Sequence, residues 1–384
     1  MRFPEFTELW SFQKFNQLVT IHARIGWQGL RRAEFLDNGN IYLITGTDFY
    51  NGKINFQSCK YITKQRYDQD KNIQVKNDDI LVTKDGSIGK IAHVSFLTEN
   101  ATLNAGIYRI RVIGKDIYPR FLFHYLNGGR LLEYASKQMT GGTIKHLNQS
   151  SIINMPIGFP SIDEQIKIAN LLDLIQEKIE TQNKIIEDLK TYKNSLVENY
   201  FENCQNFVPL SCVLKERSLY SQKGLSYEHV TLSKDGIIPK SERYDRDFLV
   251  KDNSKEYKIT KLNDICYNPA NLKFGVICLN DYGDSIFSPI YVTFEVIKFD
   301  PYYVSLYLTS KNFINYILKY QQGTVYERMA VNPEDFTKGL LPFDNDTKSF
   351  SRLAKAIALK IKIESNIAQK YNLQKTYLLQ NLFI

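Results

Sequence analysis

The sequence lacks the patterns that mark disulfide-stapled, metal-binding and secreted proteins. Its five cysteines, Cys59, Cys204, Cys212, Cys266 and Cys278, form no CxxC pair, and their odd number does not suit a disulfide framework. The five histidines show no metal-ligand spacing. The first ten residues carry acidic and aromatic side chains where a secretory leader needs a basic start and an apolar run. We therefore expect reduced cysteines, no bound metal, no membrane partner and a cytoplasmic location.

Motifs of nucleotide-using enzymes are missing too. An adenine methyltransferase needs an Asn or Asp, two prolines and an aromatic residue to hold a flipped base, whereas the run NPAN at 268–271 lacks the second proline and the aromatic. No GxGxxG occurs, and GSIGK at 86–90 is too short for a phosphate-binding loop. Asp78 and Asp79 could in principle hold a metal, but such a pair more often caps a turn. We predict that the chain is not an enzyme and has no catalytic residue or cofactor of its own.

Positive charge is unevenly distributed along the 384 residues, whose formal net charge is +8. Lys and Arg outnumber Asp and Glu by 20 to 13 in residues 1–160 and by 7 to 1 in 347–384. The corresponding counts are 5 to 8 in 161–201 and 17 to 19 in 202–346. A basic surface suits a polyanionic partner, although it can also be merely solvated. The near-neutral third segment shows that charge alone does not decide between these interpretations.

Two segments carry apolar residues at the alternating three-four spacing of a coiled coil. The first lies within 161–201 and would form a helix roughly 60 Å long, and the second, within 347–384, repeats it at an offset of 182 residues. Opposite charge balances favour pairing of the two helices with each other. The predicted seam positions, polar interruptions included, are Leu172, Ile175, Ile179, Gln182, Ile186, Leu189 and Leu196, then Ile357, Ile361, Glu364, Ala368, Tyr371, Leu378 and Leu382.

The segments before each helix also repeat, more loosely. The first reads DDILVTKDGSIGKIAHV, NAGIYRIRV, IYPRFLFHYL, MTGGTIKHLN and MPIGFPS, and the second reads NDICYNPANLKFGVICL, SPIYVTFEV, PYYVSLYLTS, QQGTVYERMA and LLPFDN. Both give paired strands, a short aromatic helix, a Gly-Thr turn and a proline exit. The chain therefore reads as one unit used twice: mixed α/β globules at 1–160 and 202–346, separated by long antiparallel helices at 161–201 and 347–384 in a pseudo-two-fold repeat.

Five stretches of the chain together point to a known family. They are RFPEF, WQGLRRAEFLDNGNIYLITGTDFYNG, VTLSKDGIIPKSERYDRDFLVKD, YNPANLKFGV followed by SPIYVTF, and PSIDEQIKIANLLDLIQEKI. In this order around the duplicated helices, they resemble the specificity subunits of bacterial type I restriction-modification enzymes. The resemblance extends over essentially the whole chain. It implies two target recognition domains, each reading one half of an asymmetric bipartite DNA site, with the helical pair setting the unread spacing between the halves.

The resemblance also implies partners. Modification subunits would dock on the chain, bind S-adenosylmethionine and methylate adenine, and a restriction subunit would translocate and cleave double-stranded DNA with ATP and magnesium. This chain would supply DNA reading only.

DNA contacts would then come from loops on each globule. Arg and Asn suit base reading, and glycine turns permit close approach to a phosphate backbone. Aromatic side chains are equally typical of a core. The candidate DNA-binding residues are Arg24, Arg31, Arg32, Lys84, Ser87, Lys90, Thr143, Lys145 and His146 in the first globule, and Lys240, Arg243, Tyr244, Arg246, Asn268, Asn271, Lys273, Tyr326 and Arg328 in the second.

Two other classes of protein remain open from the sequence. A coiled-coil scaffold that holds proteins and never touches DNA would explain the repeat and the near-neutral second globule, but not the basic first one. A stand-alone nuclease would need acidic or metal-ligand clusters that the sequence lacks. Steep salt dependence of DNA binding would favour the DNA reader.

Overall fold

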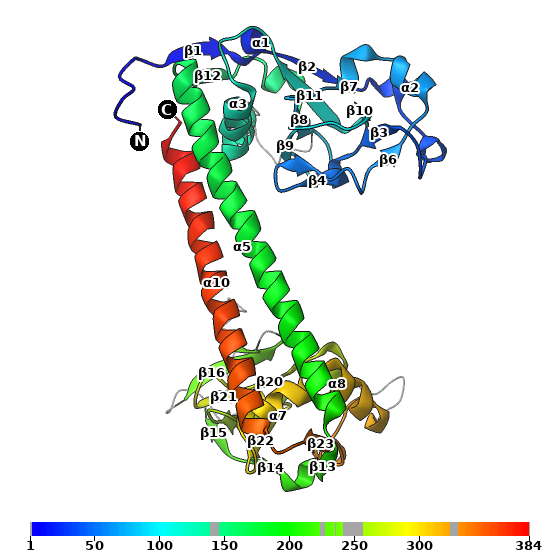
Figure 1. The fold of residues 1–384 in the computed structure, drawn as a ribbon, viewed down its shortest axis with the longest axis vertical. Helices are drawn as coiled ribbons and strands as arrows, with labels where there is room; N and C mark the ends of the chain where they lie inside the picture. Colours follow the sequence, from blue (N-terminus) through cyan, green and yellow to red (C-terminus); the bar gives the residue numbers. More distant parts are fainter. Residues whose placement is uncertain are drawn as a thin grey trace. The chain divides into compact units, whose positions relative to one another are not determined.

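Two long helices run through the fold, and both were predicted from the seam. The computed structural model describes residues 2–138, 146–222, 227–234, 236–240, 256–322 and 329–383. Helix α5 spans Ile162–Asn203 and helix α10 spans Thr347–Asn381 (Figure 1). Among the described residues, neither these nor any other helix has the length and apolarity needed to cross a membrane.

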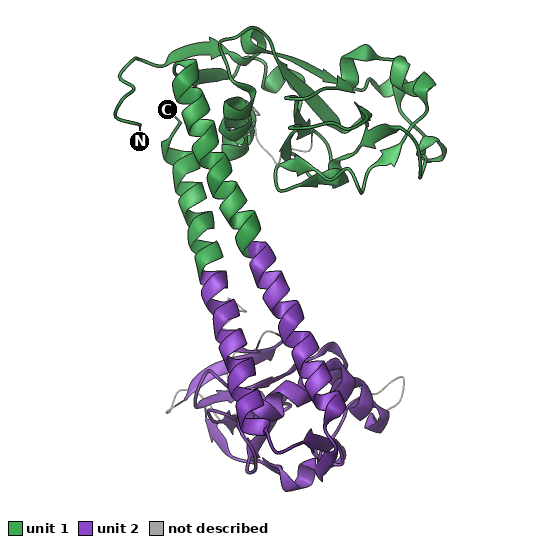
Figure 2. Ribbon diagram, in the orientation of Figure 1, with its two compact units in different colours: residues 1–182, 367–384 green, residues 183–366 purple. Residues whose placement is uncertain are grey.

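The chain divides into two compact units, each of which contains part of both long helices (Figure 2). Unit 1 comprises residues 1–182 and 367–384, and unit 2 comprises residues 183–366. Each unit thus extends beyond the globule predicted from the sequence, because the seam side chains also belong to the globular cores. In unit 1, Ile168 and Leu172 of α5 are buried in the same core as Phe121 and Leu122.

Contacts within each unit show that the two helices are antiparallel. In unit 1, Leu172 and Ile179 of α5 share a core with Leu378 of α10 and with Leu382, which directly follows that helix. In unit 2, Tyr200 near the end of α5 stacks on Phe350 near the start of α10, with ring centroids 3.6 Å apart. The seam positions named above are all buried or half-buried.

The globular part of unit 1 contains two four-stranded sheets. The first is antiparallel and has the order β2-β11-β8-β9. The second has the order β6-β3-β10-β7, with β10 and β3 parallel. The bounds are β2 Val19–Ala23, β3 Ile41–Ile44, β6 Lys60–Tyr61, β7 Gln74–Val75, β8 Ile80–Thr83, β9 Ile91–His93, β10 Asn100–Leu103 and β11 Ile107–Val112.

Unit 2 repeats both sheets, which confirms the internal repeat at the level of strand order. Its antiparallel sheet has the order β14-β22-β19-β20, and its second sheet has the order β15-β18-β21-β16-β17, with β16 and β21 parallel and β15 added. The bounds are β14 Leu214–Glu216, β15 Tyr220–Gln222, β16 Glu228–Ser233, β17 Gly236–Pro239, β18 Glu256–Thr260, β19 Ile265–Tyr267, β20 Ile277–Leu279, β21 Ser285–Phe287 and β22 Val292–Val296.

A two-stranded ribbon closes each unit beside the long helices. In unit 1, β1 (Ser11–Lys14) pairs antiparallel with β12 (Pro156–Phe159), and in unit 2, β13 (Asn206–Pro209) pairs with β23 (Leu340–Phe343). Two short helices follow β11 and two follow β22. The first helix of each pair begins with a proline, whose missing N–H costs nothing in the first turn of a helix. The pairs are α3 (Pro119–Tyr125) and α4 (Leu131–Lys137), then α7 (Pro301–Leu308) and α8 (Lys311–Ile317).

Candidate nucleic-acid interface

The turn between β8 and β9 carries three of the predicted DNA-binding residues of unit 1, Lys84, Ser87 and Lys90. The Thr83 hydroxyl donates to the carbonyl of Ser87 at 2.5 Å and accepts from the N–H of Lys90 at 2.9 Å. Gly89 has φ +78°, and a Cβ there would clash with Leu132 of α4. The turn is therefore held in one shape, with Ser87 and Lys90 exposed and Lys84 half-buried.

A second predicted segment lies directly beside this turn. The N–H of Leu147 donates to the carbonyl of Lys84 at 2.9 Å, and Nδ1 of His146 lies 2.7 Å from Oδ1 of Asp85. Nζ of Lys84 is 3.6 Å from the other oxygen of the same carboxylate. The structure thus brings together Lys84 and His146, which are 62 positions apart in the sequence. Thr143 and Lys145 lie outside the described residues.

Unit 2 builds the same arrangement from different side chains. The connection between β19 and β20 occupies the place of the β8–β9 turn, and the N–H of Val331 donates to the carbonyl of Pro269 at 3.3 Å, as Leu147 does to Lys84. Asn271 and Lys273 on this connection are exposed. Each unit therefore presents a strand connection alongside a segment from later in the chain, and the side chains on the two connections differ.

An exposed aromatic ring at the tip of the β19–β20 connection was missed by the sequence analysis. The Phe274 side chain is 54% exposed, and the ammonium groups of Lys273 and Lys234 lie 5.0 and 5.9 Å from its ring centroid. Lys234 comes from the turn after β16. The only sequence signal was an aromatic residue between a lysine and a glycine, which is equally compatible with a core residue.

A buried carboxylate holds the base of the strand that leads into each connection. Asp79, before β8, accepts two hydrogen bonds from Arg111, both at 2.7 Å, and Asp264, before β19, accepts two from Arg217 at 2.7 and 2.9 Å. Each Asp also accepts a backbone N–H from three residues earlier. The bonds to Asp264 raise the pKa of the Arg217 guanidinium. Asp79 thus caps a turn, as the sequence analysis favoured.

Two predicted DNA contacts do not fit their surroundings. Arg24 is 2% exposed and donates to the carbonyl of Leu103 at 2.8 Å, and burial lowers the pKa of its guanidinium. Asn268 is 7% exposed, and its side-chain oxygen accepts the N–H of Ala270 at 3.1 Å. Both side chains are buried and hydrogen-bonded within the protein, which does not favour the prediction that they contact DNA.

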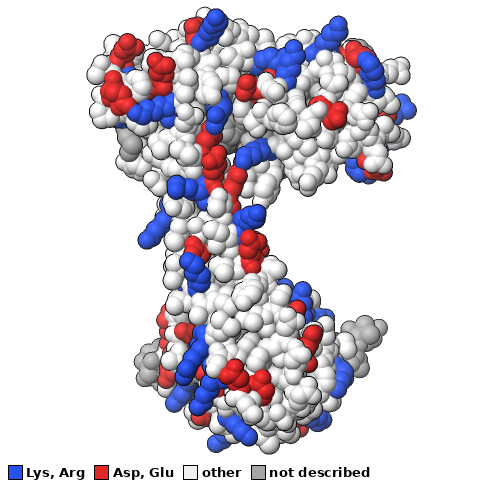
Figure 3. Space-filling view, viewed as in Figure 1, with Lys and Arg blue, Asp and Glu red and all other residues white. Residues whose placement is uncertain are grey.

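The remaining predicted residues fall into two groups. Arg31 and Arg32 are exposed, and Lys240 is half-buried. Arg243, Tyr244, Arg246, Tyr326 and Arg328 lie outside the described residues. Among the described residues drawn in Figure 3, lysine and arginine side chains form separate patches on each unit, with no continuous basic band on the face shown.

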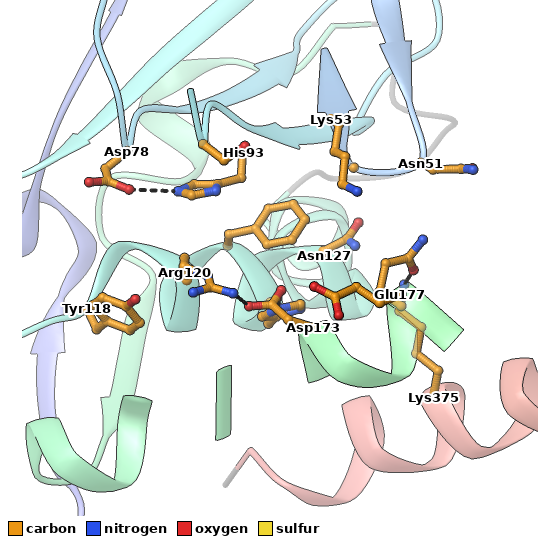
Figure 4. A pocket seen from close by; sticks show the side chains of 15 residues that line it. Asn51, Lys53, Asp78, His93, Tyr118, Arg120, Asn127, Asp173, Glu177 and Lys375 are labelled. Atoms are coloured by element: carbon orange, nitrogen blue, oxygen red, sulfur yellow. Dashed lines mark hydrogen bonds and ion pairs between the residues drawn. The ribbon is translucent and has the colours of Figure 1, made fainter. Parts of the chain in front are cut away.

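A pocket of about 490 Å³ in unit 1 is lined by side chains of both charges (Figure 4). Asp173 of α5 pairs with Arg120 and with Nε2 of His124, while Lys375 of α10 donates to Gln176 at 2.6 Å. Burial, followed by the nearby cations, lowers the pKa of His124 well below its ordinary value. Because the lining charges neutralise one another, this pocket does not suit a polyanion, and the strand connections remain the better DNA-facing candidates.

A metal-ligand cluster or a reactive thiol in the described part of the chain would point to catalysis. No cluster of three His, Cys, Asp or Glu there could hold a metal ion. All five cysteines are free thiols. Burial raises the pKa of Cys59 and Cys266 to about 12, so these thiols remain protonated and unreactive.

Comparisons with known proteins identify similar sequences and a similar fold. Residues 8–191 match the family described as the type I restriction modification DNA specificity domain. The specificity subunit of the Escherichia coli type I restriction enzyme EcoBI is 24% identical over 192 residues, which are 50% of this chain and 40% of that relative. The MjaVIII specificity subunit of Methanocaldococcus jannaschii is 26% identical over 198 residues, which are 49% of this chain and 45% of that relative.

The match to each of these two relatives spans less than half of the relative's length. A solved structure of a type I restriction-modification S subunit from M. genitalium covers 100% of this chain, and 99% of its own chain is aligned, with a TM-score of 0.61 at 14% identity. That similarity extends the shared fold over both units.

Proposed function

Because this chain belongs to the type I restriction-modification specificity family, we propose that it reads an asymmetric bipartite DNA site for partner subunits that carry out the chemistry. The observation that carries this proposal is the repeated pair of strand connections. The backbone arrangement is the same in both units, but the side chains differ: Lys84 and His146 in unit 1, and Asn271 and Lys273 in unit 2. Such a pair suits two half-sites of different sequence. The chain itself would be non-catalytic and would act on DNA in the cytoplasm.

Exposed apolar residues on the long helices support binding of partner proteins. On α5, Leu174, Ile185 and Tyr192 are 56%, 38% and 56% exposed, away from the seam. On α10, Leu359, Ile363, Leu373 and Tyr377 are between 45% and 64% exposed. Apolar residues repeated along a helix face outside its own core are typical of a protein interface. We propose that modification subunits carrying S-adenosylmethionine bind here, and that a restriction subunit using ATP and magnesium joins them.

The direct test is to co-express this chain with a modification subunit encoded beside its gene and to map methylated adenines across the genome. We expect one asymmetric, interrupted motif that disappears when this chain is omitted. Methylation that persists without the chain, or a demonstrably active partner that methylates no motif with it, would overturn the proposal. The latter result would return the chain to the scaffold hypothesis, which no observation above specifically favours.

Lysines on the strand connections are expected to control the salt dependence of binding. Lys84→Gln and Lys273→Gln should each weaken binding to all duplexes alike and reduce the slope of log affinity against log salt by about 1. The measurement is fluorescence anisotropy of the assembled complex between low and moderate salt.

The matched control is Lys64→Gln, because Lys64 is paired with Asp68 on its own helix, α2 (Lys64–Asp68). An equal change of slope in the control would show that the effect comes from net charge and not from contacts at the connections.

A further inference from the structure

The tip of the β19–β20 connection in unit 2 is a short, well-anchored turn. Residues Leu272–Phe274 form one turn of 3₁₀ helix, which Gly275 closes with φ +77° and an N–H bond to the carbonyl of Leu272 at 2.8 Å. Leu272 is fully buried, whereas its neighbours Asn271, Lys273 and Phe274 are exposed. The turn therefore fixes the exposed side chains on a rigid base.

Asn271 and Phe274 lie at the two ends of this turn. The N–H of Phe274 donates to the carbonyl of Asn271 at 3.0 Å, which makes them residues i and i+3 of the turn. Asn271 precedes the 3₁₀ helix as its N-cap, and both side chains are exposed. An exposed amide and an exposed aromatic ring thus lie three residues apart on one anchored turn.

The surroundings of the ring favour a nucleic acid over an apolar protein surface. Lys273 and Lys234 place ammonium groups 5.0 and 5.9 Å from the ring centroid, so a ligand covering the ring must also accept two positive charges. The major groove of DNA offers both an apolar group, the C5 methyl of thymine, and flanking phosphates. Adenine presents N6 and N7 in the same groove, where an Asn side chain can bond both.

We propose that Phe274 contacts the C5 methyl of a thymine in the half-site read by unit 2, beside an adenine that Asn271 recognises. This inference rests on the DNA-reading function proposed above. The β8–β9 turn of unit 1, which the structure describes in full, carries no exposed ring at this place, because Ile88, which precedes Gly89 as Phe274 precedes Gly275, packs against the core. The methyl contact would therefore belong to one half-site only.

The test removes the methyl group and the ring separately. Once the methylated motif is mapped, duplexes are made with uracil in place of each thymine of the motif in turn. Binding is measured with the full chain assembled with its modification subunit. At one thymine of one half-site, uracil should weaken wild-type binding by about fourfold, which is the loss of affinity expected when one buried methyl group is removed. Phe274→Ala should weaken binding to the thymine duplex similarly and abolish the difference between thymine and uracil.

Two further variants sharpen the result. Phe96→Ala is the matched control, since Phe96 is 68% exposed on unit 1, and it should leave affinity and the uracil effect unchanged. Asn271→Ala should reduce discrimination at a neighbouring adenine by about tenfold. Because both tip side chains are exposed, these variants are expected to fold.

Three outcomes would go against the inference. If Phe274→Ala retains the uracil effect, the ring does not touch the methyl. If the wild type but not Phe274→Ala raises the fluorescence of 2-aminopurine placed at a base step, the ring inserts between bases, and the methyl contact is wrong. A wild-type complex that binds no mapped motif at all would instead overturn the proposed function.

Discussion

Seven residues inserted into each long helix should lengthen the unread part of the DNA site by roughly three base pairs and leave both half-sites unchanged. Seven helical residues add about 10 Å and rotate the chain to within about 20° of its starting direction, while duplex DNA rises about 3.4 Å per base pair. Tyr200 of α5 stacks on Phe350 of α10 in unit 2. Because the helices are antiparallel, counting ten residues back from Tyr200 and ten forward from Phe350 places Lys190 opposite Lys360. Copies of residues 184–190 and 354–360 inserted after these lysines keep the seam in register.

The outcome is read by mapping methylated adenines in cells that carry the lengthened chain. A paired insertion of five residues is the control, because it rotates one end by about 140° and breaks the apolar spacing, and methylation should be lost. Altered bases within either half-site, or an unchanged spacing after the seven-residue insertion, would show that the helices do not set the distance.

Removal of Arg111 is expected to have the largest effect on stability. Arg111→Met leaves Asp79, whose side chain is fully buried, without its paired charge, and breaking such a pair costs about 3 to 5 kcal/mol of unfolding free energy. Arg217→Met should do the same in unit 2, where the Asp264 side chain is 3% exposed. Urea denaturation of the complex, with probes in each unit, should show the loss in the altered unit.

The double variant Arg111→Met with Asp79→Asn separates charge from packing. Asn has no charge to leave unpaired, and its side-chain oxygen can still accept the Lys76 N–H that Asp79 accepts at 2.7 Å. Most of the lost stability should therefore return. If Arg111→Met alone lowers the unfolding free energy by less than about 1 kcal/mol, the backbone hydrogen bond to Asp79 is sufficient to stabilise the buried carboxylate.

The large-scale architecture was predictable because its signals are local and repetitive. A three-four apolar spacing over forty residues has few structural solutions, and its recurrence at an offset of 182 identifies a duplication without any knowledge of the fold. Lys84 and His146 were chosen for a different reason, as basic residues at glycine-rich turns, and the structure places them beside one another. Strand order within each unit was beyond this reasoning, because pairing between distant strands leaves little trace in either strand alone.

Individual contact residues were harder to predict, since residue type does not fix burial. Arg24 and Asn268 have side chains well suited to reading bases, yet both are buried, and the Arg24 guanidinium and the Asn268 side-chain oxygen form hydrogen bonds within the protein. Phe274 shows the reverse, an apolar residue left exposed because buried Leu272 already anchors its turn. In both cases tertiary packing overrides the chemical character of the side chain.

The composition of unit 1 also constrains the order in which the protein can fold as it is synthesised. Its core includes Leu378, Leu382 and Phe383, and the Phe383 ring packs edge-on against Phe121 at a centroid distance of 5.3 Å. A ribosome makes the rest of that core some 200 residues earlier. Unit 2, built entirely from residues 183–366, can close before then. The half of the protein translated first is thus completed last, and premature termination near residue 370 would damage the amino-terminal unit more than the unit next to the break.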